Sequence, residues 1–240
     1  MTKHFCGRTL MTKHFCGRTL LQKCMIFSLL CFATNVCSQP SWQLYESKQG
    51  VSVYFQRLTD DTLKMKAETV VNNVTAEDLV ALLSDTDTAP SWIENITKVT
   101  LLKSLSPSEN LVYSYIDSPW PVSNRDVITY SCYTKLNDLQ TQLSIHARPD
   151  FLPQTKGVIR IRTLNATWLL TQQAENLHIS YQVYALPGGK IPTWLNNRVA
   201  LKSTLKTLIN LAEILTTKQY IAKPTVIRTG DCTHGELPQL

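Results

Sequence analysis

Apolar and polar residues alternate along most of the chain after residue 40. Between residues 63 and 71 the odd positions carry leucine, methionine, alanine, threonine and valine, while lysine or glutamate fills most of the even ones. A period of two places the apolar side chains on one face, as in a half-buried antiparallel strand. The same kind of pattern predicts strands at 42–46, 51–58, 63–71, 96–102, 111–117, 127–134, 139–147, 158–163, 166–171 and 177–183. The segments 158–163 and 166–171 are expected to form a hairpin around Leu164 and Asn165.

Two segments have helical periodicity instead. Thr75 to Asp78 resembles a capping box, with Asp in place of the usual Glu or Gln, and apolar residues follow it until Pro90. From Thr193 to about Lys218 the apolar residues fall at 194, 195, 201, 205, 208, 209, 212 and 215. This spacing predicts an amphipathic helix of about 25 residues, or roughly 38 Å, which is long enough to cross the face of a sheet.

The order of these elements predicts an α+β fold. Strands, one short helix and a long series of antiparallel strands precede the closing helix, so a large curved sheet has only this helix to cover its apolar face. Where sheet and helix do not touch, a hydrophobic cavity should remain. Its walls would come from the inward-facing set, which includes Val127, Leu143, Ile145, Tyr181 and Val183.

A stiff corner separates two of the predicted strands. Ser118 to Asp126, called the proline corner here, contains Pro119 and Pro121 on either side of Trp120, followed by an Arg-Asp pair. Each proline restricts its own φ and pushes the preceding residue toward extended geometry. Two interpretations of Arg125 remain open. It closes the corner by pairing with a neighbouring carboxylate, or it faces a buried site, where a guanidinium can hold a phosphate or carboxylate.

The N-terminus has the layout of a secretory signal peptide. The sequence MTKHFCGRTL occurs twice in the first 20 residues, so either Met1 or Met11 is the start. Basic residues end at Lys23, and the apolar run 25–33 that follows is too short to span a bilayer. Residues that are small or tolerated at the −3 and −1 positions then predict cleavage of the signal peptide between Ser38 and Gln39. A lipoprotein site at Cys37 and an uncleaved anchor are the alternatives. The mature protein is expected to be exported, either periplasmic or secreted.

Charge and cysteine content narrow the classes of partner. The formal charge is +6, but residues 1–38 hold five basic and no acidic residues, which leaves 19 basic against 18 acidic residues. A nearly neutral mature chain does not favour a nucleic-acid partner. Cleavage leaves Cys132 and Cys232, and both a disulfide and two free thiols remain open. No CxxC and no Cys/His ligand spacing survives, so no structural zinc site or other metal site is expected. No cofactor is expected either.

Several short motifs, taken in order, resemble the START family of lipid-transfer domains, of the bacterial secreted kind. They are Asp85 followed by Trp92, the proline corner, Arg160 and Arg162 ahead of Trp168, and Tyr181 leading to the run 187–196. The likeness covers about residues 42–218, within an expected domain at 39–222 that a polar tail at 223–240 follows. It implies a helix-grip fold, in which a curved antiparallel sheet grips the C-terminal helix over a hydrophobic tunnel. It also implies one bound lipid or sterol-like molecule and no catalysis.

One position departs from the family pattern. Some animal members pair an arginine placed like Arg125 with an acidic residue on the strand after the tryptophan, and Lys98 stands at that position here. Either Asp117 or Asp126 partners Arg125, or the polar end of the cavity is built differently. Ligand identity therefore does not carry over from those members.

The function expected from the sequence is non-enzymatic binding, and possible transfer, of a hydrophobic ligand. The expected ligand-binding residues are Trp92, Arg125, Val127, Leu143, Ile145, Tyr181, Val183, Trp194, Leu201 and Leu205. A cyclase- or aromatase-like enzyme and a protein-interaction module are the alternatives. By strand parity His146 and His178 point away from the apolar face, so no catalytic residue is assigned. Transient membrane contact and a monomeric state are also expected, and Gly188-Gly189 is a possible hinge.

Overall fold

The computed structural model describes residues 41–118, 122–217 and 232. The chain divides into a unit of Met1–Cys37 and a unit of Ser38–Leu240, and all described residues belong to the second. The predicted signal peptide, Pro119 to Pro121 of the proline corner and nearly all of the polar tail lie outside the described residues.

The elements follow the order expected from the sequence. The strands are β1 (Gln43–Lys48), β2 (Val51–Arg57), β3 (Leu63–Asn72), β4 (Ile96–Ser106), β5 (Glu109–Ile116), β6 (Arg125–Asn137), β7 (Gln140–Ala147), β8 (Ile159–Arg160), β9 (Thr163–Gln173) and β10 (Asn176–Leu186). The helices are α1 (Ala76–Ser84), α2 (Ala89–Trp92) and α3 (Thr193–Thr216). Within the described residues the strands form one sheet in the order β1-β2-β3-β10-β9-β7-β6-β5-β4, antiparallel throughout except that β8 runs parallel beside β6.

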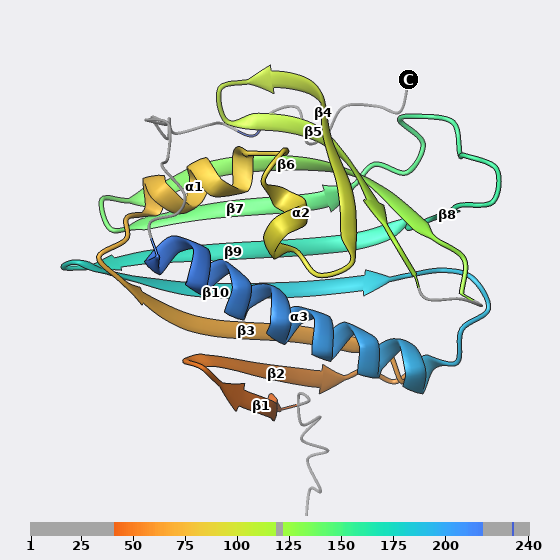
Figure 1. Cartoon of the computed structure of the whole chain (residues 1–240), viewed down its shortest axis with the longest axis horizontal. Helices are drawn as coiled ribbons and strands as arrows, with labels where there is room; N and C mark the ends of the chain where they lie inside the picture. The colour runs from red at the N-terminus through yellow and green to blue at the C-terminus, as the bar shows by residue number, and fades with distance from the viewer. Residues whose placement is uncertain (1–40, 119–121, 218–231, 233–240) are drawn as a thin grey trace, which may run out of the picture. The chain divides into compact units, whose positions relative to one another are not determined.

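The long helix α3 crosses one face of this sheet, as Figure 1 shows, and packs against β2 and β3. The predicted α+β helix-grip arrangement is therefore confirmed. The predicted start of α1 is also confirmed, because the Asp78 amide donates to Thr75 Oγ1 at 3.2 Å and the Thr75 amide donates to Asp78 Oδ2 at 2.9 Å. No helix among the described residues is long and apolar enough to cross a membrane.

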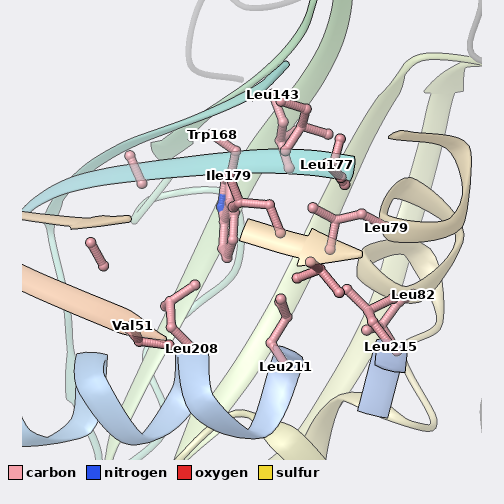
Figure 2. Packing of buried hydrophobic residues seen from close by; sticks show 14 of the residues in the cluster. Val51, Leu79, Leu82, Leu143, Trp168, Leu177, Ile179, Leu208, Leu211 and Leu215 are labelled. Atoms are coloured by element: carbon pink, nitrogen blue, oxygen red, sulfur yellow. The ribbon is translucent and has the colours of Figure 1, made fainter. Parts of the chain in front are cut away.

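The main hydrophobic core lies between α3, α1 and the inner face of the sheet. Figure 2 shows Leu208 and Leu211 of α3 pointing toward Ile179 and Trp168, with Leu82 of α1 nearby. These leucines are almost fully buried. Burying one leucine side chain contributes about 1.5–3 kcal/mol, so this contact fixes the helix on the sheet.

The predicted hairpin around Leu164 and Asn165 is wrong. Both residues lie inside β9, where they pair with Ala185 and Tyr184 of β10. Leu164 faces inward, and exposed Asn165 contacts His146 at 2.9 Å on the outer face, so the two continue the strand alternation instead of turning. Ile159 and Arg160 form β8, which pairs with β6 and not with β9, so the two segments do not make a hairpin.

A disulfide joins Cys132 of β6 to Cys232, a pairing that the sequence left open. Cys132 lies on the outer face of β6 and packs with Leu111 and Tyr130 in a second, smaller core. The bond closes a segment with a sequence separation of 100 residues. It therefore attaches residue 232 to the outer face of the sheet.

Reducing this disulfide should destabilise the fold. Closing a loop of this length restricts the unfolded chain and contributes up to about 4–5 kcal/mol. Urea unfolding with a phosphine reductant should show a lower midpoint than unfolding without it. Cys232→Ser should show the same loss and no response to reductant. Equal midpoints for the oxidised and reduced protein would contradict a stabilising role.

Candidate ligand cavity

A cavity of about 520 Å³ lies between α3 and the inner face of the sheet. Ligand sites of small molecules typically measure about 300–1,000 Å³. One row of its wall runs across neighbouring strands in register, from Ser131 through Ile145, Ala166 and Val183 to Met65. The sheet therefore supplies a mostly apolar wall, whose side chains strand pairing holds in place.

Helix α2 and the start of β4 close another side of the cavity, and hydrogen bonds attach them to α3. The Glu94 amide donates to Thr207 Oγ1 at 3.0 Å, and Asn95 Nδ2 donates to Ser203 Oγ at 3.0 Å. Trp92 is 3% exposed and lines the cavity, and its indole N–H is buried without a partner among the described residues.

The structure places most of the predicted ligand-binding residues on this wall. They are Trp92, Arg125, Val127, Leu143, Ile145, Tyr181 and Val183. That they contact a ligand stays a prediction. Sequence reasoning missed Ala166 and Trp168 of β9. The alternation within the predicted strand 166–171 was the signal that could have placed them on the inner face.

Three predicted residues lie elsewhere. Trp194 is 66% exposed and does not line the cavity. Leu201 and Leu205 are buried in the core and do not line the cavity. The apolar stripe of α3 packs on the sheet, whereas the neighbouring side, which mixes apolar with small and polar residues, faces the cavity. That side includes Asn196, Ala200, Ser203 and Thr207.

Aromatic side chains form the inner part of the wall. Trp168 and Tyr181 are cross-strand neighbours, and their ring centroids lie 4.4 Å apart. Burial raises the pKa of Tyr181 well above its usual value. Burial likewise raises the pKa of Tyr133 to about 12. Both phenols are therefore neutral near pH 7, where they can donate a hydrogen bond but cannot act as bases.

Arg125, 5% exposed, lies where the proline corner enters β6 and lines the cavity. Its Nη1 donates to Ser123 O at 2.6 Å and to Ser118 Oγ at 3.1 Å. Its Nε donates to Pro187 O at 3.3 Å and its Nη2 to Gly188 O at 3.4 Å. The guanidinium thereby joins the corner to the turn that precedes α3.

Neither predicted carboxylate partner pairs with Arg125. Asp126 projects from the opposite face of β6 and forms a buried bidentate pair with Arg160, with Nε–Oδ1 at 2.6 Å and Nη2–Oδ2 at 3.0 Å. Asp117 forms no ion pair among the described residues, and Lys98 is exposed on β4. The polar end of the cavity is thus built differently from the acidic pairing known in some animal members.

Arg160 forms its hydrogen bonds on the outer face of the sheet. Besides Asp126, it donates to the carbonyls of Pro149 at 2.6 Å and Leu152 at 3.0 Å. Its hydrogen bond to Asp126 raises the pKa of the Arg160 guanidinium. This arginine therefore fixes the loop between β7 and β8 behind the cavity wall.

The turn before α3 packs closely on the cavity edge. Gly189 has φ +77°, and a Cβ there would lie 2.7 Å from Ile159 Cδ1 and 3.7 Å from Arg125 Nη2. A side chain at this position would have to displace the end of the Ile159 side chain and adopt a φ that other residues rarely take, so glycine lets the turn approach Arg125.

A model of the START domain matches residues 32–217 of the chain. The chain belongs to the START domain family. The match ends at the last turn of α3 and includes every strand described above. No cluster of His, Cys, Asp or Glu suited to a metal ion occurs in the part of this START domain that the structure describes.

Individual relatives show the same likeness. An uncharacterized protein of Pseudomonas aeruginosa is 33% identical over 71% of this chain and 84% of its own length. Human phosphatidylcholine transfer protein is 28% identical over 71% of this chain and 82% of its own. A crystal structure of a STAR-related lipid transfer protein from Xanthomonas axonopodis aligns with a TM-score of 0.68 and 31% identity, covering 72% of this chain and 98% of that one.

Two neighbouring arginines provide a matched test of the buried ion pair. Arg160→Met should destabilise the protein by about 3–5 kcal/mol, because Asp126 is left buried without its counter-charge. Arg162→Met removes only the exposed pair with Asp150 and should cost less than about 1 kcal/mol. Urea unfolding of both variants measures the difference. Equal losses would show that Arg160 does not hold the outer face.

Proposed function

We propose that this START domain binds one lipid, or another hydrophobic molecule, in the cavity and carries it between membranes without catalysing a reaction. The observation that carries the proposal is the mostly apolar cavity of about 520 Å³ between α3 and the sheet. Relatives named as lipid transfer proteins support the same function. Burying apolar ligand surface contributes about 25 cal/mol per Å², before the entropic costs of binding.

The side chains around the cavity favour a carrier over a cyclase-like enzyme. General acid–base catalysis needs a titrating group positioned at the substrate. Tyr181 and Tyr133 are neutral, and Glu94 is paired with Lys206 at 2.7 Å. His146 lies exposed on the outer face, away from the cavity. The proposed role of the site is therefore to hold a molecule without changing it.

We further propose that the N-terminal end of α3 contacts the donor and acceptor membranes. Trp194 is 66% exposed there. Val199 is 48% exposed, and unlike Trp194 it lines the cavity. Tryptophan favours the interface between water and lipid. Exposed Arg198 and Lys202 lie on the same helix and can attract anionic lipid. A ligand could then leave between α3 and the sheet, with the Gly188-Gly189 turn acting as a hinge.

Export of the protein is part of the same proposal. The predicted signal peptide supports a periplasmic or secreted location, and so does the disulfide between Cys132 and Cys232, because disulfides persist in oxidising compartments. The expectation that the protein acts as a monomer stays a prediction.

Solvent extraction of the purified protein, followed by mass spectrometry, tests the proposed function. We expect about one lipid molecule per protein. Val183→Trp, which fills the cavity, should retain far less lipid, whereas Val70→Trp on the exposed outer part of β3 should retain it fully. Melting curves confirm that both variants fold. Wild-type protein that neither retains lipid nor takes it up from vesicles would refute the proposal.

Trp194→Ala tests the membrane contact. Because the side chain is largely exposed, the melting temperature and the lipid content should stay unchanged, while the rate of lipid transfer between vesicles should fall several-fold. Phe151→Ala is the control, since Phe151 is an exposed aromatic residue that does not line the cavity. Equal transfer rates for all three proteins would argue against docking through this end of α3.

A further inference from the structure

Arg125 is a buried cation that no anion compensates among the described residues. Its four hydrogen bonds all go to neutral oxygens, three of them backbone carbonyls. Arg160 provides the contrast, because it is equally buried and holds both carboxylate oxygens of Asp126. Buried charges in proteins are usually paired, since removing a charge from water is costly. The positive charge of Arg125 therefore lacks a counter-charge among the described residues.

The donor geometry leaves capacity for a further acceptor. A guanidinium has five N–H groups, and the bonds of Arg125 use the Nε group, both groups on Nη1 and one on Nη2. One N–H on Nη2 has no acceptor among the described residues. Because Arg125 lines the cavity, a bound molecule can reach this end of the side chain.

The other charged groups on the wall do not compensate Arg125. Glu94 is paired with Lys206 of α3. Asp117 is exposed and lies beyond ion-pair distance of Arg125. The rest of the wall is apolar or carries neutral hydroxyl and amide groups, so Arg125 is the buried charge that a ligand in this cavity would meet.

We propose that the ligand carries an anionic oxygen group, either a carboxylate or a phosphate, and that this group is the counter-charge of Arg125. The inference rests on the proposed function of the cavity and specifies its ligand class. A charge-assisted hydrogen bond is shorter and stronger than one to a neutral carbonyl, so an anionic group would bind Arg125 better than Pro187 or Gly188 does. Neutral lipids, including sterols, would leave the buried charge uncompensated.

Binding of four single-chain probes to delipidated protein tests this inference. Dodecanoic acid is compared with its methyl ester, and dodecyl phosphate with dodecanol, so that each pair differs in charge but shares one chain. Fluorescence of Trp92 and Trp168, which line the cavity, reports binding. The anionic member of at least one pair should bind at least about tenfold more tightly than its neutral partner. The pair with the larger ratio identifies carboxylate or phosphate as the preferred group.

Arg125→Gln and Lys190→Gln form the matched variants. Arg125→Gln keeps hydrogen-bonding capacity but removes the charge, and it should abolish the preference while affinity for the neutral probes changes less than about twofold. Lys190 is exposed and does not line the cavity, so Lys190→Gln should keep the preference. The wild-type comparison remains decisive even if Arg125→Gln fails to fold.

The outcomes separate this inference from the function on which it rests. If wild-type protein binds charged and neutral probes equally well, the cavity is a lipid site and the inference about charge is overturned. A preference that survives in Arg125→Gln would likewise overturn the role of Arg125. If none of the four probes binds, the proposed function itself fails.

Discussion

One helix cannot cover the whole inner face of so wide a curved sheet, and the rest of the structure depends on this constraint. The leucines of α3 bury against β2, β3 and their neighbours, which fixes the helix over one part of the sheet. The remaining space between the helix and the sheet becomes the cavity, whose wall includes residues of β3, β4, β5, β6, β7, β9 and β10. The short segment from α2 to β4 closes it because Glu94 and Asn95 bond to α3. The cavity is thus a consequence of the helix contact.

Strand β6 divides two roles between its faces. Arg125 and Val127 face the cavity, whereas Asp126 and Cys132 face the opposite side. There Asp126 pairs with Arg160 of β8, and Cys132 forms the disulfide with Cys232. Adjacent residues in a strand point in opposite directions. Arg125 therefore belongs to the cavity, whereas Asp126 has a structural role on the outer face. The buried pair of Asp126 with Arg160 supports the wall from behind.

The cavity edge joins three segments that are distant in sequence. Arg125 bonds to the carbonyls of Pro187 and Gly188, and Gly189 packs against Ile159 of β8. Any movement of the turn before α3 therefore changes the surroundings of the guanidinium.

Local sequence patterns determined the positions of most strands and of the helices α1 and α3. Period-two alternation located most strands, the Thr75–Asp78 capping box located α1, and the stripe after Pro192 located α3, because these signals depend on residues close in sequence. Tertiary structure alone decided which part of α3 faces the cavity, since an apolar stripe packs where a sheet is available, and Leu201 and Leu205 therefore lie in the core. It also decided that Asp126 pairs with Arg160 and not with Arg125, and that Cys132 meets Cys232. Those partners lie 34 and 100 residues apart, and no local pattern records which distant residue a side chain will meet.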